Sequence, residues 1–223
     1  MSPGPRITLI HAVQVAIAPV ADALRALWPE ARAEHLWDDG LGPALAAAGA
    51  LTPQLKARIR RLAEHALANG AEGVLYTCSA FGEAIAEVAA AHPQPVLRPN
   101  EAMFEAALQA GPRVGLVATF ASACAPMEAE FHALCAARGR GDITLRTLCL
   151  PEALADAQAG RLEAHDARHL QAVPDFAAGC DVLMLAHFSN ARVQPLLQAR
   201  LDLPVLAAPQ AAVQALRARL QPA

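Results

Sequence analysis

The chain has 223 residues, a net charge of −3 and 55% hydrophobic residues. This length suffices for one α/β domain or for two lobes of about 100 residues, each with its own core. No basic block, signal-peptide pattern or membrane-length apolar run is present, so we expect a cytoplasmic protein without nucleic-acid or membrane partners. The chain has five cysteines, an odd number, and no C-x-x-C motif. We therefore expect neither a disulfide framework nor a zinc site.

Short β-branched or Leu-rich runs alternate with Ala-rich helical stretches along the chain. We expect strands at residues 7–10, 33–37, 73–76, 114–117, 143–148 and 182–185. We expect helices at residues 16–27, 53–68, 81–91, 125–137 and 161–172, and a loop with a helical turn at 40–51. Such alternation predicts an α/β fold with mainly parallel sheets flanked by helices.

The two halves of the sequence resemble each other. Residues 5–27 (PRITLIHAVQVAIAPVADALRAL) match residues 112–134 (PRVGLVATFASACAPMEAEFHAL) without a gap. GAEGVLYTCS, from Gly70, matches GCDVLMLAHF, from Gly179, and this match pairs Cys78 with His187. The pattern predicts two pseudo-symmetric lobes, residues 1–98 with a returning C-terminal helix at 206–223, and residues 99–205. The alternative is that any two βα units of an Ala-rich chain look alike.

Cys78 and His187 are the candidate catalytic residues. Both directly follow a predicted strand, and ligands of open parallel sheets bind at the carboxyl ends of strands. We therefore expect the two residues to face one cleft between the lobes. The helix start after Cys78 favours a thiolate, and a histidine such as His187 serves as acid or base near neutral pH. The alternative is a space-filling cysteine and a histidine that only caps or packs.

Six further side chains are candidates for substrate binding. Thr77 and Ser79 flank Cys78, and their hydroxyl and backbone N–H groups suit a carboxylate. His11 ends the first strand, and Thr119 stands near the matching place in the second half. Ser189 and Asn190 follow His187. Capping of the next helix is the alternative role for the threonine, serine and asparagine residues of this set.

Other polar motifs do not indicate a metal or a nucleotide. His165 and His169 share a helix face, but no third ligand stands out and the neighbouring charges suggest a solvated surface. No glycine-rich nucleotide motif is present, so we expect no cofactor. The remaining cysteines, which are interpreted as core residues, are Cys124, Cys135, Cys149 and Cys180.

Two segments resemble motifs of the aspartate/glutamate/hydantoin racemase superfamily. VLYTCSAFGEAI, from Val74, resembles the first motif and matches it at Cys78. DVLMLAHFSNA, from Asp181, resembles the second, with Ala186 and His187 in the places of its Gly and Cys. The resemblance implies two lobes with the site between them, and a cofactor-independent racemase or epimerase. The substrate would be a small carboxylate or cyclic amide that loses and regains a proton at the carbon next to its carbonyl. A homodimer is compatible with the same resemblance.

The sequence departs from the family pattern in two places. His187 replaces the second cysteine, and His11-Ala12 replaces the Asp-Ser or Asn-Pro usual after the first strand. A single cysteine is also compatible with related enzymes such as arylmalonate decarboxylase, or with maleate cis–trans isomerase, in which cysteine acts as a nucleophile. A third alternative is a two-lobed protein that binds a small molecule without turnover.

Overall fold

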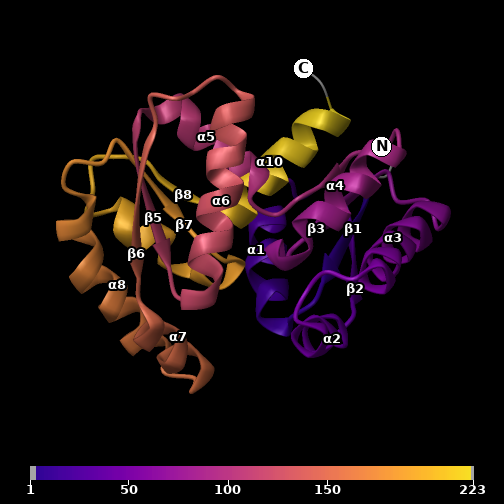
Figure 1. Cartoon of the computed structure of the whole chain (residues 1–223), viewed down its shortest axis with the longest axis horizontal. Coiled ribbons are helices and arrows are strands. Elements are labelled where there is room, and N and C mark those ends of the chain that lie inside the picture. Colours follow the sequence, from indigo (N-terminus) through magenta and orange to yellow (C-terminus); the bar gives the residue numbers. More distant parts are fainter. Residues whose placement is uncertain (1–3, 222–223) are drawn as a thin grey trace. The chain divides into compact units, whose positions relative to one another are not determined.

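The computed structural model describes residues 4–221 and divides the chain into two compact units (Figure 1). Unit 1 comprises Met1–Ala102 together with Pro209–Ala223, and unit 2 comprises Met103–Ala208. Each unit contains one four-stranded parallel sheet flanked by helices. The predicted α/β class with parallel sheets is therefore confirmed.

The sheet of unit 1 has the strand order β2-β1-β3-β4. Its strands are β1 (Arg6–His11), β2 (Arg32–Trp37), β3 (Gly73–Tyr76) and β4 (Val96–Leu97). Its helices are α1 (Ile17–Leu27), α2 (Leu41–Ala48), α3 (Pro53–Ala68), α4 (Gly82–Ala91), the start of α5 (Glu101–Ala110) and nearly all of α10 (Ala208–Leu220). Short 3-10 helices, η1 (Gln14–Ala16) and η2 (Ser79–Phe81), precede α1 and α4.

The sheet of unit 2 has the equivalent order β6-β5-β7-β8. Its strands are β5 (Arg113–Ala118), β6 (Thr144–Cys149), β7 (Val182–Leu185) and β8 (Val205–Ala207). Its helices are the rest of α5, α6 (Ala121–Ala137), α7 (Pro151–Gln158), α8 (Leu162–Ala177), the 3-10 helix η3 (Phe188–Val193) and α9 (Gln194–Gln198).

Apolar central strands and helix caps fix these elements. Every residue of β3 is buried, as is typical of a central parallel strand covered on both faces, whereas most of the edge strand β2 is exposed. Thr52 caps α3 by accepting a hydrogen bond from the N–H of Leu55 at 3.3 Å. The core of unit 1 also holds a buried hydroxyl, because Tyr76 donates to the carbonyl of Ile59 at 2.6 Å.

The structure differs from the predicted elements in several places. Residues 41–48, expected to be mostly loop, form α2, which ends at Gly49 in the left-handed conformation that suits a helix C-terminus. Four short elements lie where no strand or helix was predicted: β4, α7, α9 and β8. The strands β4 and β8 have two and three residues, too few for a hydrophobic period to be recognised in the sequence.

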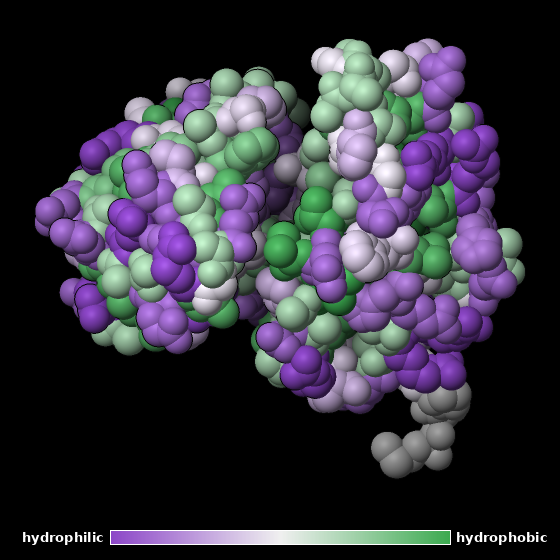
Figure 2. Space-filling view, turned by 90° about the horizontal axis from the view of Figure 1, so that it is seen from below, coloured by the Kyte–Doolittle hydropathy of each residue, from purple (hydrophilic) through white to green (hydrophobic). Residues whose placement is uncertain are grey.

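The surface is mixed in character. Figure 2 shows hydrophilic and hydrophobic residues interspersed over the visible face. Within residues 4–221, no helix is both long enough and apolar enough to cross a membrane.

Candidate functional site

The strand registers give Cys78 and His187 equivalent places in the two sheets. In unit 1, Ile10 of β1 pairs with Tyr76 of β3, and in unit 2 Val117 of β5 pairs with Leu185 of β7. Cys78 and His187 each come two residues after the last of these strand residues. Each sheet therefore presents its candidate residue at the carboxyl end of the strand beside its central β1 or β5, as the sequence repeat predicts.

Cys78 is half-buried and stands immediately before η2. Burial raises the pKa of its thiol, and the backbone N–H of Ala80, which donates to the sulfur, only partly offsets this effect. Burial therefore favours the protonated thiol, whereas the sequence predicts a thiolate. A single 3-10 turn separates Cys78 from α4, so the helix terminus does not act directly on the sulfur.

A chain of three polar side chains leads to the residue before Cys78. The Nδ1 atom of His11 lies 2.9 Å from the Thr77 hydroxyl, and its Nε2 atom lies 2.9 Å from Nδ1 of His35. The two imidazole rings are stacked, with centroids 5.1 Å apart. His11 is fully buried, whereas His35 on β2 is exposed, so the chain connects the solvent with Thr77.

His187 has a strained backbone and an unpaired nitrogen. It has φ 66° and ψ 139°, and among residues 4–221 it is the sole non-glycine residue with a positive φ. Such outliers persist where the surroundings enforce them, often at functional sites. Its Nε2 atom is buried without a hydrogen-bond partner among the described residues. Burial also lowers the pKa of His187, which favours the neutral imidazole.

Thr119 and Asn190 meet at the carboxyl end of the unit 2 sheet. The Thr119 hydroxyl donates to Oδ1 of Asn190 at 3.4 Å, and both side chains are buried. Neither residue caps a helix: the residue before α6 is Phe120, and Asn190 lies inside η3. The Nδ2 amide of Asn190 has no partner within the described chain, which leaves its N–H groups for a ligand. Ser79 and Ser189, both half-buried, lie in η2 and η3 respectively.

A buried histidine, among charged neighbours that suggested a solvated surface, lies against Asn190. Nε2 of His165 lies 3.4 Å from Oδ1 of Asn190, and its Nδ1 lies 2.9 Å from the Asp166 carboxylate. Burial opposes ionisation of Asp166, but hydrogen bonds from Arg192 and His165 outweigh it and lower the pKa of the carboxyl. His165 and His169 are 1% and 0% exposed, so the interpretation of this helix face as solvated is wrong.

The other cysteines divide into two kinds. Cys135 and Cys180 are buried, in agreement with a packing role, whereas Cys124 and Cys149 are half-buried, and the nearby thiol of Cys149 helps to raise the pKa of Cys124. The interpretation of the latter two as core residues is therefore wrong. No group of three or more metal-ligating side chains occurs within the described part of the chain.

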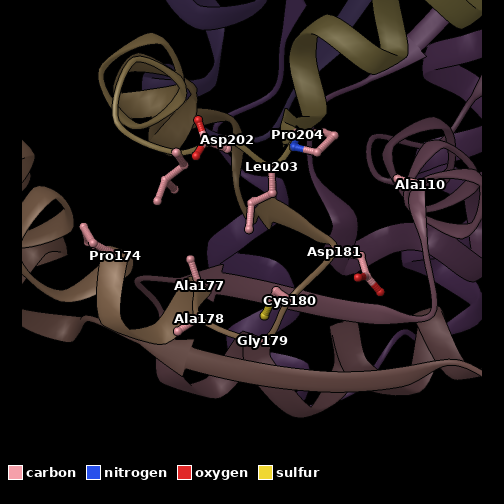
Figure 3. A pocket seen from close by; sticks show the side chains of 11 residues that line it. Ala110, Pro174, Ala177, Ala178, Gly179, Cys180, Asp181, Asp202, Leu203 and Pro204 are labelled. Atoms are coloured by element: carbon pink, nitrogen blue, oxygen red, sulfur yellow. The ribbon is translucent and has the colours of Figure 1, made fainter.

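A surface pocket of about 610 Å³ lies at the opposite, amino end of the unit 2 sheet (Figure 3). Residues that precede β7 and β8 contribute to it, including Gly179, Cys180, Leu203 and Pro204. Ligands of parallel sheets bind at the carboxyl ends of strands, where Thr119, His187 and Asn190 lie. The pocket is therefore separate from the candidate site.

Comparison with known proteins identifies the family. The family model described as Asp/Glu/Hydantoin racemase matches residues 16–134, just over half of the chain, a segment that includes Cys78 but not His187. None of the curated proteins that were searched matches the sequence.

Several solved structures share the fold. Allantoin racemase from Klebsiella pneumoniae is 19% identical, with a TM-score of 0.66 over 96% of this chain and 87% of that one. Aspartate racemase from Picrophilus torridus is 12% identical, with a TM-score of 0.72 over 97% and 94%. An unliganded arylmalonate decarboxylase is 17% identical, with a TM-score of 0.58 over 98% and 94%. The family match and the shared fold lead to one conclusion: the chain belongs to the Asp/Glu/hydantoin racemase family, a family of isomerases.

Proposed function

We propose that the chain is a cofactor-independent racemase or epimerase in which Cys78 and His187 are the two acid–base residues for one small substrate. The observation that carries the proposal is their equivalent placement, two residues beyond β3 and β7, in sheets of identical strand order. Family membership supports the class of reaction. The substrate would be a small carboxylate or cyclic amide.

The protonation states of the two residues suit a proton transfer at carbon. Because burial raises the pKa of Cys78 and lowers that of His187, the resting pair is a thiol and a neutral imidazole. Nε2 of His187 would remove the proton next to the carbonyl, and the Cys78 thiol would supply a proton to the resulting enolate. The unpaired lone pair of a buried imidazole is well suited to the first step.

Nearby donors suit the negative charge of the substrate and of the enolate. The free N–H groups of Asn190, the hydroxyls of Ser79 and Ser189, and the backbone N–H groups of η2 are all donors at strand ends. The hydroxyl of Thr77 is not free for this purpose, because it donates to the carbonyl of Ile10. Fixed donors of this kind stabilise an enolate oxygen as its charge develops. Thr119 donates to Oδ1 of the Asn190 amide and so helps to orient it.

Each turnover leaves a Cys78 thiolate and a His187 imidazolium, which must exchange protons before the next one. The chain His35–His11–Thr77 is a candidate route for part of this exchange: it leads from exposed His35 through two contacts of 2.9 Å to Thr77, whose hydroxyl donates to the carbonyl of Ile10 at 3.4 Å. A neutral imidazole accepts a proton on one nitrogen and releases one from the other. His11 would then bind substrate only indirectly, through Thr77.

The test is solvent-deuterium exchange followed by NMR. Pooled amino acids, hydantoins, hydroxy acids and substituted malonates would be incubated with the wild type and with Cys78→Ser and His187→Gln. Deuterium is expected at an existing α-carbon with the wild type, and each variant should lose about 100-fold or more of the rate, as expected for an acid–base residue. Cys124→Ser and His132→Gln are matched controls. Undiminished exchange in both site variants would refute the proposal.

A cysteine-dependent decarboxylase or cis–trans isomerase is the second candidate. The specific observation in its favour is that Cys78 is the sole candidate thiol at these two positions and is held protonated, which suits delivery of a proton to one face. This candidate predicts release of CO₂ from a substituted malonate, or isomerisation of a double bond. Either activity would depend on Cys78 and persist in His187→Gln, which separates it from the racemase.

A further inference from the structure

Cys124 and Cys149 form a thiol pair that the proposed reaction does not use. Cys149 is the last residue of β6, and its Cα pairs with that of Ala118 at the end of β5. From Ala118 the chain passes through Thr119 and Phe120 into α6, and Cys124 lies in the first turn of that helix. The thiol of Cys149 is near enough to that of Cys124 to help raise its pKa, and both residues are partly accessible to solvent.

We propose that Cys124 and Cys149 are a reversible dithiol–disulfide pair, oxidised by hydroperoxides, that ties the first turn of α6 to the end of β6. The proposal does not depend on the proposed racemase activity. It rests on two cysteines that the end of β6 and the first turn of α6 place near each other, and not on a single reactive thiol.

Unit 1 supports the interpretation of this pair as a specific feature of unit 2. In the strand register, Trp37 holds the place of Cys149, since it pairs with His11 as Cys149 pairs with Ala118. In the sequence repeat, Ile17 holds the place of Cys124. The duplicated framework therefore forms without thiols at these two positions, and the cysteines are not required for packing.

The first turn of α6 has fewer backbone hydrogen bonds than a regular helix, so the Cys124 thiol can move to within bonding distance of Cys149. Pro126 lies inside the helix and has no backbone N–H, so the carbonyl of Ser122 lacks its usual helical hydrogen bond. The thiol of Cys124 donates a hydrogen bond to the carbonyl of Phe120 at 3.7 Å. Phe120 itself is 54% exposed.

The oxidation takes two steps. One of the two cysteines, as its thiolate, attacks the hydroperoxide, which breaks the O–O bond, releases water or an alcohol and leaves a sulfenic acid on that cysteine. The sulfur of the other cysteine then attacks that sulfur, and a molecule of water leaves as the disulfide forms. Two thiols are oxidised by two electrons in total, and one peroxide is reduced.

The experiment treats the full chain carrying Cys78→Ser, so that the candidate catalytic thiol consumes no oxidant, with hydrogen peroxide and then with trypsin. Cleavage at arginine gives residues 114–138, which contain Cys124 and Cys135, and residues 147–161, which contain Cys149. We expect these two peptides to be linked, and dithiothreitol to release them. Adding Cys124→Ser or Cys149→Ser should abolish the link, whereas adding Cys135→Ser, the matched control, should retain it.

A second probe requires no oxidant. Phenylarsine oxide, a trivalent arsenical that bridges two close thiols, should bind one equivalent per chain and then protect both peptides from alkylation. Hydrogen exchange of the amides at residues 120–125 should slow in the oxidised protein. The proposal is overturned if peroxide gives only separate sulfinic acids, or if the link persists in Cys124→Ser. Failure of either test leaves the racemase proposal untouched, since Cys78 takes no part.

Discussion

Buried histidines make the stability of this protein depend on pH. His11 is fully buried, and its pKa is lowered to about 4, first by burial and then by the charge of His35. In the unfolded chain the same group titrates near its ordinary value of 6.5. The unfolded state therefore binds more protons between about pH 6.5 and pH 4. The stabilising contribution of neutral His11 is present above this window and is lost as the pH falls through it.

We predict that the free energy of unfolding falls between about pH 7 and pH 4.5 and that His11→Gln flattens this dependence. At about 1.4 kcal/mol per pKa unit, protonation of His11 lowers the free energy of unfolding by at most roughly 3 kcal/mol over this range. Urea denaturation at a series of pH values measures the slope. His132→Gln, at an exposed position of α6, is the control and should keep the wild-type slope. An unchanged slope in His11→Gln would contradict the assignment.

His165 acts on the site only through Asn190. The Asp166 carboxylate can only accept a hydrogen bond, so Nδ1 of His165 carries a proton; Nε2 lies 3.4 Å from Oδ1 of Asn190 and donates to it only when the ring carries both protons. If Asn190 binds the substrate carboxylate, Asn190→Ala should raise KM by about 10- to 100-fold, since hydrogen bonds to charged groups contribute about 1.5–3 kcal/mol.

His165→Leu should raise KM in the same way, with a smaller change in kcat. His165→Gln retains a polar group near Asn190 and should restore most of the affinity. Steady-state kinetics on the substrate found by deuterium exchange would separate the two parameters. A loss in kcat alone, or no rescue by glutamine, would indicate that His165 serves folding instead.

The sequence was enough to select candidate residues at the ends of strands, but not to predict which side chains contact one another. Cys78, His187, Thr77 and Asn190 could be selected because each follows a recognisable strand. His35 could not, since its role depends on the register between β1 and β2, which brings it beside His11. For His165 a signal existed: residues at intervals of four, 165, 169, 173 and 177, are all buried. Charged neighbours concealed this buried face of α8.

At the scale of the element, side chains of β7 and α8 fill the space beside Gly115 of β5. Gly115 of β5 has the place that Thr8 has in β1. A Cβ atom at Gly115 would lie 2.5 Å from Cδ2 of Leu183 and 3.0 Å from Cε1 of Phe176 on α8. The sheet of unit 2 therefore has no room for a side chain at this point.

We predict that Gly115→Ala lowers the free energy of unfolding by about 1–3 kcal/mol, the usual effect of overpacking a core. The control is Gly141→Ala, because a Cβ atom there has no neighbour within 4 Å. That substitution should change stability by less than about 0.5 kcal/mol. Urea denaturation of both variants gives the comparison, and equal stabilities would show that Leu183 and Phe176 move aside freely.

Helices and strands could be predicted from the sequence where their hydrophobic pattern extended over enough residues to be recognised. Strand positions and the long helices followed from hydrophobic runs and from Pro53 at a helix start. The eight-residue helix α2 was missed because its sequence, LGPALAAA, contains glycine and proline, which usually indicate a loop. Its tertiary packing, with Leu41 only 1% exposed, outweighs that local preference.

At the scale of the whole molecule, the two units differ in how the chain builds them. Unit 2 is continuous from Met103 to Ala208, whereas unit 1 is completed by the last segment of the chain, from Pro209. In α10, Leu216 is 1% exposed and packs close to Gly73 of β3, and Arg217 donates to the carbonyl of Leu27 at 2.7 Å. The C-terminal helix therefore belongs to the core of the first unit.

We predict that Leu216→Ala lowers the free energy of unfolding of unit 1 by about 2–5 kcal/mol, as for other large-to-small core substitutions. Hydrogen exchange followed by mass spectrometry should show lost protection in α3 and β3 and little change in α8. Leu197→Ala, a fully buried position in the core of unit 2, is the reciprocal variant and should give the opposite pattern. If both variants weaken protection equally throughout the chain, the two units unfold as one cooperative body, and the division into separate cores does not govern stability.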